Sequence, residues 1–216
     1  MARATQVEPV RIGSGADATE GMLWLPQEHV GVVVFINGGK RVNQPNDYVA
    51  TMLRNARLGT LWVDLRSNGE PASWQSPAIE RLSDRLHAVC DWLRQHDAAC
   101  NLPIGLLGSS YGTAAALQLA AAKECGISAL VLRGGRPDLA MHGVLTEISA
   151  PTLLIVGGLD DGVLQTNRAV YAALRCKKRI EIIPGATHTF EEPGSLEVVA
   201  RLARGWFLQH TDVAYA

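Results

Sequence analysis

The chain has 216 residues, enough for one globular domain whose core needs neither disulfides nor a structural metal. Hydrophobic residues make up 47% and charged residues 19%, which excludes a disordered or collagen-like chain. The net charge is −1, without a block of like charge, so neither nucleic acid nor a membrane surface is expected as a partner. The first residues lack a signal peptide's apolar segment, and the 4 cysteines are widely spread. We therefore expect a cytoplasmic protein with reduced thiols.

Short apolar runs alternate with longer amphipathic segments along the whole chain. Continuous hydrophobicity without alternation is typical of strands that helices cover on both faces. The predicted strands are residues 31–36, 60–64, 103–108, 129–132, 152–157 and 179–184. The predicted helices are residues 45–57, 78–97, 112–124, 165–175 and 194–210. This order predicts an α/β fold with a mostly parallel central sheet, and the pieces near 6–12 and 19–25 should add an antiparallel edge.

The sequence contains neither an internal repeat nor a linker, so residues 1–216 are expected to form a single domain. Between the fourth and fifth of the apolar runs above, the chain from Gly134 to Pro151 has room for one short helix. That is too little for a lid domain. We expect an open site without a large lid.

The apolar run at 103–108 ends in Gly108-Ser109-Ser110-Tyr111-Gly112, a G-x-S-x-G pattern followed at once by a predicted helix. Glycines on both sides of Ser110 relieve crowding in a sharp strand-to-helix turn, which would expose the serine oxygen at the sheet edge. The pattern alone also arises by chance, so its position between a strand and a helix carries the interpretation. Ser109 lacks flanking glycines at this spacing. Ser110 is therefore the candidate nucleophile.

A serine nucleophile needs a base, and the base needs an acid that holds its tautomer. In this architecture the chain order is serine, then acid, then histidine, each after a later strand. The run at 152–157 is followed by Asp160 and Asp161, and the run at 179–184 is followed by His188. We predict His188 as the base. Either aspartate could be the acid, while the other caps the following helix.

An oxyanion hole would combine the backbone amide of Tyr111, after the nucleophile, with an amide from the loop that follows residues 31–36. In that loop Gly39 is the candidate donor, although Gly38 and Gly39 could also simply form a turn. The Arg133-Gly134-Gly135-Arg136 segment could hold an anionic substrate group or be an ordinary solvated loop.

Other binding motifs are missing from the sequence. Gly39-Lys40 lacks the spacing of a phosphate-binding loop, and Gly13-Ser14-Gly15 lacks the third glycine of a dinucleotide site. No His, Cys or carboxylate pair has metal-ligand spacing. We expect no cofactor and no metal.

These motifs resemble the α/β-hydrolase superfamily from about residue 30 to 210. The small lidless chain is similar to its dienelactone-hydrolase-like branch, in PIGLLGSSYGTAAAL, RGGRPDL, PTLLIVGGLDDGVL and PGATHTFEEPGSLEVV. The branch has a valine three residues after the acid, and the resemblance therefore favours Asp160, with Val163, as the acid. Dienelactone hydrolase itself has a cysteine nucleophile, where this chain has Ser110. Many relatives begin the oxyanion loop with His-Gly, where this chain has Asn37-Gly38.

The sequence predicts a serine hydrolase of the carboxylesterase type, which cleaves small ester, thioester or lactone substrates through an acyl-enzyme. Ser110, Asp160 and His188 would form its triad. The alternative is a catalytically silent hydrolase-fold module that binds a small ligand or a partner protein. The sequence indicates neither the physiological substrate nor the oligomeric state.

Overall fold

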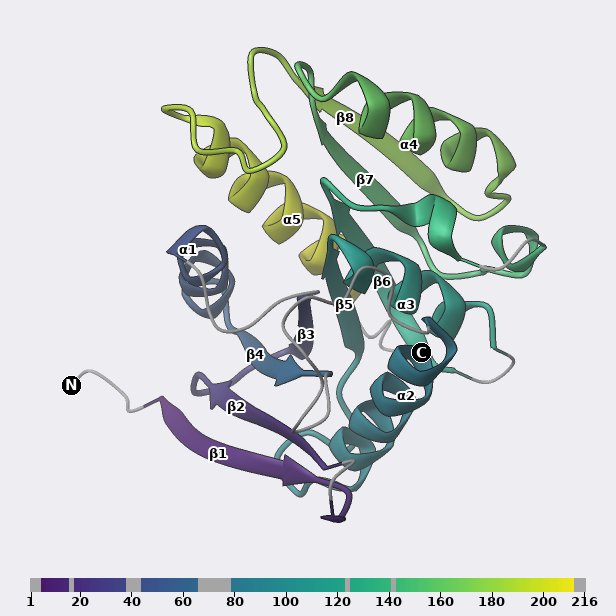
Figure 1. Ribbon diagram of the computed structural model, residues 1–216. Coiled ribbons are helices and arrows are strands. Elements are labelled where there is room, and N and C mark those ends of the chain that lie inside the picture. The colour runs from purple at the N-terminus through teal and green to yellow at the C-terminus, as the bar shows by residue number, and fades with distance from the viewer. Residues whose placement is uncertain are drawn as a thin grey trace.

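The computed structural model describes residues 5–15, 18–37, 44–65, 79–122, 125–140 and 143–211. Eight strands form one sheet in the order β1-β2-β4-β3-β5-β6-β7-β8 (Figure 1). They are β1 (Gln6–Ile12), β2 (Thr19–Leu25), β3 (Gly31–Asn37), β4 (Leu58–Asp64), β5 (Ile104–Ser109), β6 (Ile127–Arg133), β7 (Thr152–Gly157) and β8 (Lys178–Ile183). The first two strands pair antiparallel at one edge and the other neighbours from β3 to β8 are parallel, which confirms the predicted α/β fold.

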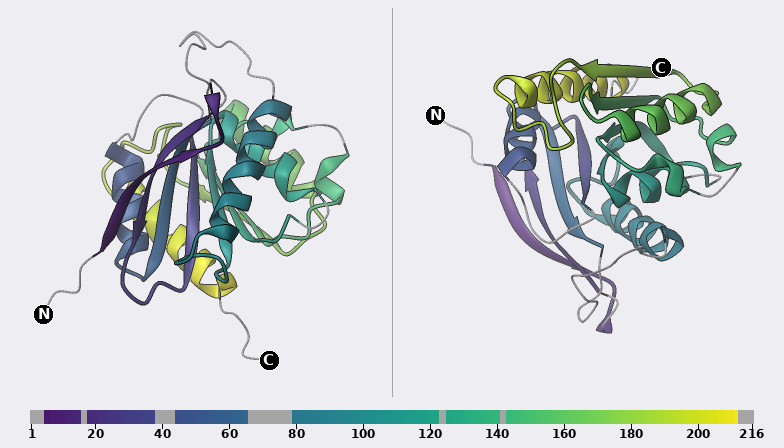
Figure 2. Two further views of the ribbon diagram at one scale, coloured as in Figure 1. Left: turned by 90° about the horizontal axis from the view of Figure 1, so that it is seen from below. Right: turned by 45° about the horizontal axis from the view of Figure 1, so that its top comes forward.

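Helices cover both faces of this sheet. They are α1 (Gln44–Arg54), α2 (Ile79–Gln95), α3 (Tyr111–Ala120), α4 (Asp161–Ala173) and α5 (Ser195–Thr211). Helices α1 and α5 lie on one face, and α2, α3 and α4 lie on the other (Figures 1 and 2). None of the helices in the described part of the chain is long and apolar enough to cross a bilayer.

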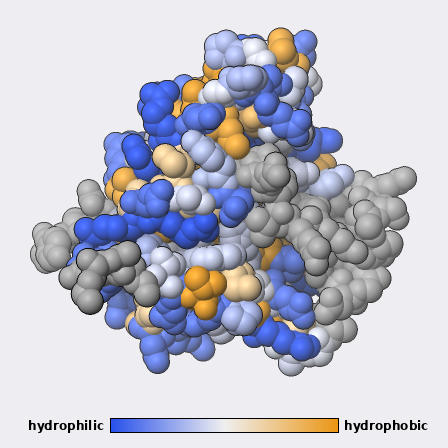
Figure 3. Space-filling view, turned by 90° about the vertical axis from the view of Figure 1, so that its left-hand side faces the viewer, coloured by the Kyte–Doolittle hydropathy of each residue, from blue (hydrophilic) through white to orange (hydrophobic). Residues whose placement is uncertain are grey.

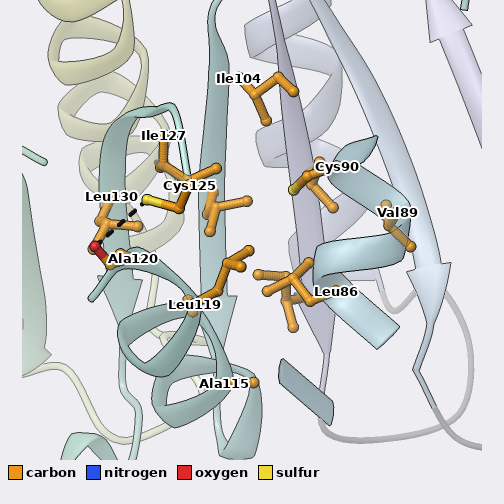
Figure 4. Packing of buried hydrophobic residues seen from close by; sticks show 14 of the residues in the cluster. Leu86, Val89, Cys90, Ile104, Ala115, Leu119, Ala120, Cys125, Ile127 and Leu130 are labelled. Atoms are coloured by element: carbon orange, nitrogen blue, oxygen red, sulfur yellow. Dashed lines mark hydrogen bonds between the residues drawn. The ribbon is translucent and has the colours of Figure 1, made fainter. Parts of the chain in front are cut away.

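Each face of the sheet carries its own hydrophobic core. Under α2 and α3, the core includes Leu86, Cys90 and Leu130, and Figure 4 shows how α2, α3 and the strands contribute to it. Under α1 and α5, the second core includes Phe35 and Phe207. Both sides of the central strands are therefore buried, which explains why their sequences are apolar without alternation.

The cysteines are all free, as the wide spacing predicts. Cys90 and Cys125 are buried in the first core, and the thiol of Cys125 donates to the carbonyl of Ala120 (Figure 4). Burial raises the pKa of Cys90 to about 12, so this thiol stays protonated at neutral pH.

The segment between β6 and β7 is short, as expected. Its described residues form two single-turn 3-10 helices, η2 (Pro137–Leu139) and η3 (Val144–Thr146), where the sequence predicted room for one short helix. On the face seen in Figure 3, hydrophobic side chains are scattered among hydrophilic ones.

The site of interest lies at the carboxyl ends of the parallel strands, where ligands bind in such sheets.

Candidate active site

Ser110 occupies the tight turn between β5 and α3. Its backbone has φ 51° and ψ −128°, a conformation that residues other than glycine rarely adopt. Such a backbone costs about 1–3 kcal/mol and persists only where the surrounding structure enforces it. The strain lies at the residue that the G-x-S-x-G pattern singled out.

The glycines on both sides of Ser110 are required by close backbone approaches. A Cβ atom on Gly112 would lie 2.3 Å from the carbonyl oxygen of Ile36, and one on Gly108 would lie 3.0 Å from the backbone nitrogen of Thr113. These neighbours are main-chain atoms of a central strand and a helix, which cannot move aside cheaply. The turn is therefore built around the two glycines.

Asp160 and His188 are hydrogen-bonded at the neighbouring strand ends. The Nδ1 atom of His188 lies 2.7 Å from Oδ2 of Asp160. The His188 side chain is 51% exposed and the Asp160 side chain 19%, so the carboxylate is largely shielded while the imidazole remains accessible. With Nδ1 engaged, Nε2 is the ring nitrogen left for another group. Asp161 is exposed and begins α4.

Backbone hydrogen bonds hold the two loops that carry Asp160 and His188 together. The amide of Gly158 donates to the carbonyl of Ile183 at 2.8 Å, and the amide of Leu159 donates to the carbonyl of Ala186 at 3.0 Å. Each bond joins the loop after β7 to the chain at or just after the end of β8. Main-chain hydrogen bonds therefore hold Asp160 and His188 close together, in addition to the contact between their side chains.

Glu192 holds the His188 loop through the residue that precedes His188. Its Oε1 atom accepts hydrogen bonds from the backbone amide of Thr187, at 3.0 Å, and from the Thr187 hydroxyl, at 2.5 Å. The hydrogen bond from the Thr187 side chain lowers the pKa of Glu192 below its ordinary value, because it favours the ionised carboxylate. The ionised Glu192 carboxylate thus closes the loop by binding Thr187, the residue before His188.

Arg133, the last residue of β6, lies buried beside this loop. Its Cα pairs in register with Ser109, and its guanidinium lies 5.8 Å from the ring centroid of Phe190. Arg133 is 7% exposed, and its Nη1 atom has no hydrogen-bond partner within the described residues. Burial lowers the pKa of Arg133 to about 10, so it stays a cation at neutral pH. Of the two arginines in the Arg133-Gly134-Gly135-Arg136 segment, Arg136 is the exposed one. It is paired with Asp138, as expected for a residue in a solvated loop.

The structure thus brings several of the sequence-predicted residues to the carboxyl ends of the parallel strands. Ser110, Asp160 and His188 follow β5, β7 and β8 respectively, and Tyr111 is the first residue of α3. The remaining oxyanion candidate, Gly39, lies outside the described residues. No group of three or more His, Cys, Asp or Glu side chains in the described ranges could hold a metal ion.

Two residues of this region, Phe190 and Glu192, were given no role from the sequence, and for a third, Arg133, the sequence left open whether it holds an anionic substrate group or lies in a solvated loop. Arg133 ends an otherwise apolar strand, Phe190 combines φ 58° with 1% exposure, and Glu192 closes the His188 loop. The sequence indicated Arg133 through its place in the Arg133-Gly134-Gly135-Arg136 segment, which comes at the end of an apolar run. The roles of Phe190 and Glu192 depend on contacts that no local pattern reveals.

Comparison with known proteins places these features in context. Residues 62–150, which include Ser110, match the family of X-Pro dipeptidyl-peptidases (S15 family). The crystal structure of dienelactone hydrolase from Anabaena variabilis superposes with a TM-score of 0.90 at 39% identity, over 96% of this chain and 99% of that chain. Est1E from Butyrivibrio proteoclasticus superposes with a TM-score of 0.79 at 16% identity, over 94% of this chain and 98% of that chain. The second likeness concerns the fold alone.

Two curated relatives from Mycobacterium tuberculosis strains are longer proteins. Each is 42% identical over 206 residues, which cover 94% of this chain and 46% of the relative. Both carry the provisional name of phosphoribosyl transferase. The chain therefore spans about half the length of the curated relatives that it matches, and their name describes the longer proteins.

Proposed function

Because the chain belongs to the α/β-hydrolase superfamily, in its dienelactone-hydrolase-like branch, we propose that it is a serine hydrolase of the carboxylesterase type. The observation that carries the proposal is the 2.7 Å contact between His188 Nδ1 and Asp160 Oδ2, at the sheet edge where Ser110 occupies its strained turn. A nucleophile, a base and an acid that orients the base are the minimal set for acyl transfer.

In the first half of the reaction, the Ser110 hydroxyl attacks the carbonyl carbon of the substrate. His188 takes the hydroxyl proton through Nε2, because Nδ1 is engaged by Asp160. The Asp160 carboxylate stabilises the resulting imidazolium. The negative charge on the carbonyl oxygen is stabilised by the Tyr111 amide, at the positive end of α3, together with the proposed Gly39 amide. His188 then returns the proton to the leaving alcohol or thiol.

In the second half, water replaces the leaving group. His188 Nε2 removes a proton from the water molecule as its oxygen attacks the acyl carbon. The bond to Ser110 Oγ then breaks, the serine oxygen recovers the proton, and the carboxylic acid leaves. Neither half requires a metal or an organic cofactor.

The proposed substrates are small esters, thioesters or lactones. Two short turns stand between β6 and β7 in the described residues, where larger hydrolases would carry a lid, and His188 is half exposed. These features favour accessible acyl groups over long lipid chains. A relative named dienelactone hydrolase at 39% identity adds lactones to the compounds worth testing.

The test is hydrolysis of p-nitrophenyl esters of increasing acyl length by the wild-type chain and the Ser110→Ala variant. Loss of at least about 10³-fold in kcat/KM is expected for Ser110→Ala. Labelling with a fluorophosphonate, followed by peptide mass spectrometry, should place the adduct on Ser110. The neighbouring variant Ser109→Ala should still be labelled, since Ser109 is buried at the end of β5.

Two outcomes would contradict the proposal. Ester hydrolysis that survives Ser110→Ala in folded protein would exclude this nucleophile. A folded wild-type chain that neither hydrolyses esters, thioesters or lactones nor takes the fluorophosphonate label would instead favour a silent module that binds a ligand or a partner.

A further inference from the structure

The two edges of the sheet differ in how they are protected. β1, at one edge, carries Pro9 at its centre, and proline cannot donate a backbone hydrogen bond to an added strand. β8, at the other edge, contains no proline and pairs with β7 along its whole length. Among the described residues, no further strand follows β8 in the sheet (Figure 1). The outer side of β8 is therefore suited to pairing with another strand.

Hydrophobic side chains are exposed at this same edge. Within the described residues, the large hydrophobic side chains that are exposed are Val7, Tyr48, Leu159 and Ile182. Ile182 lies on β8 and is 38% exposed, and Leu159 lies in the turn after β7 and is 65% exposed. The chain just before Leu159 lies close to Ile182, because a Cβ atom on Gly158 would lie 3.6 Å from Cγ2 of Ile182. Two of these four exposed residues thus lie on β8 or in a turn whose backbone is bonded to the chain just after it.

The charges on β8 are arranged as a self-complementary pattern. Arg179 and Glu181 are two residues apart, so their side chains share one face of the strand and form an ion pair there. Ile180, between them, packs against the core on the other face. If a second β8 strand lies antiparallel about a two-fold axis through Ile180, Arg179 of each copy lies opposite Glu181 of the other. Opposite charges at directly opposed positions stabilise an antiparallel pair.

We propose that two copies of this chain associate through their β8 strands, antiparallel and centred on Ile180, to form one sheet that runs through both subunits. A two-fold arrangement uses the same patch on both partners, as the pattern of Arg179 and Glu181 requires. Ile182 of each copy then lies beside Lys178 of the other strand and loses exposed apolar area. The association is independent of the chemistry proposed for Ser110.

A weak, concentration-dependent dimer is expected rather than an obligate one. A six-residue strand with its flanking helix residues gives a small interface, and small interfaces support transient association. Charge also sets the choice of partner. A strand whose side-chain charges all had one sign would pair with an oppositely charged protein. The opposite charges of Arg179 and Glu181 instead complement the same two residues in a second copy of the chain.

The test is sedimentation velocity over about 5 to 500 μM protein, a range that spans weak dimer dissociation constants. It compares wild type with Arg179→Glu, with Glu181→Arg and with the double variant that exchanges the two charges. Each single change opposes like charges across the axis and should weaken the dimer at least tenfold. The double variant restores both opposite-charge pairs and should recover affinity to within about threefold. Arg201→Glu, an exposed change on α5, is the control for the change in net charge that Arg179→Glu brings.

Each variant is checked for folding by its melting temperature. Hydrogen exchange provides a second measurement on the wild-type chain, in which the amides of β8 should become more protected as concentration rises. A wild-type chain that stays monomeric over the whole range would overturn the proposal. So would a dimer that the single charge reversals leave intact, because the copies would then meet through another surface.

Discussion

The guanidinium of Arg133 lies over the aromatic ring of Phe190, 5.8 Å from its centroid. Phe190 is two residues beyond His188, and it is held with φ 58° at 1% exposure. A Cβ atom on Gly134, next to Arg133, would lie 3.0 Å from the carbonyl oxygen of His188. The His188 loop therefore packs against the end of β6. The contact between the Arg133 guanidinium and the Phe190 ring holds the loop there.

Replacing Arg133 by methionine should separate stability from activity. A buried cation with no carboxylate partner among the described residues costs desolvation energy, so an apolar side chain of similar length should leave the melting temperature unchanged or raise it. Phe190 would lose its cation contact, and the His188 loop would be less well fixed. We expect kcat/KM for a short ester to fall about tenfold, since small misplacements of a catalytic group are costly.

The control for this experiment is Arg136→Met. Arg136 is exposed and paired with Asp138, and its loss should change neither property appreciably. An Arg133→Met variant with wild-type kcat/KM would contradict the positioning role. An Arg133→Lys variant keeps the cation and should recover part of the activity.

The two adjacent aspartates should differ sharply in function. Asp160 contacts His188 at 2.7 Å, whereas Asp161 lies exposed in the first turn of α4. Asp160→Asn should lower kcat by about 10³- to 10⁴-fold, because the amide favours the wrong imidazole tautomer. Asp161→Asn should keep its activity and lose about 0.5 kcal/mol of stability, through a weaker interaction with the helix dipole. Equal losses of kcat in the two variants would contradict the assignment of Asp160.

Much of the fold could be predicted from the sequence because the buried strands are continuous apolar runs. The helix ends were harder. The predicted helix at 165–175 is α4 at Asp161–Ala173, which begins earlier and ends where Lys178 donates to the carbonyls of Tyr171 and Leu174. That stop comes from a residue on the next strand, so the local sequence of the helix does not contain it.

The candidate site also contains residues that the local sequence predicts and residues that it does not. Ser110 and His188 could be placed because each follows a strand within a recognisable local pattern. The local residues left Asp160 and Asp161 open, the family resemblance favoured Asp160, and the contact of Asp160 with His188 comes from a loop that approaches from another strand. The role of Arg133 required still more, because it depends on a contact with Phe190, which lies far along the chain. Local patterns thus locate strand ends, whereas contacts between loops decide which side chains meet.

Gly112→Ala should be among the most damaging small substitutions in the chain. Its Cβ atom would lie 2.3 Å from the carbonyl oxygen of Ile36, a main-chain atom in the middle of the sheet. We expect insoluble or inactive protein, with a loss of several kcal/mol if it folds. Gly205→Ala, in α5, is the matched control, since no atom beyond the helix's own backbone and the adjacent residues would lie within 4 Å of its Cβ. That change should raise stability by about 0.5–1 kcal/mol in denaturant unfolding. A well-folded, active Gly112→Ala would contradict the account of the turn.

Glu192 should make the stability of the His188 loop depend on pH. The carboxylate accepts two hydrogen bonds from Thr187, and the side-chain bond lowers its pKa in the folded state. A lowered pKa means that the ionised form stabilises the fold above the ordinary pKa of glutamate, about 4.3. This contribution is lost as the pH falls through the lowered folded-state pKa. Glu192→Gln should therefore melt below wild type near pH 7, with the difference shrinking towards pH 3.

The measurement is a series of melting curves for wild type and Glu192→Gln between about pH 3 and pH 7, a range that brackets the ordinary glutamate pKa. Glu197→Gln, a change in the first turn of α5, is the control for the loss of one negative charge. The Glu197 carboxylate interacts with the helix dipole, so its removal should have a smaller effect. A Glu192→Gln deficit that stays constant down to pH 3 would show that the carboxylate charge does not stabilise the loop. The hydrogen bonds of Thr187 would then depend on the shape of residue 192 rather than on its ionisation.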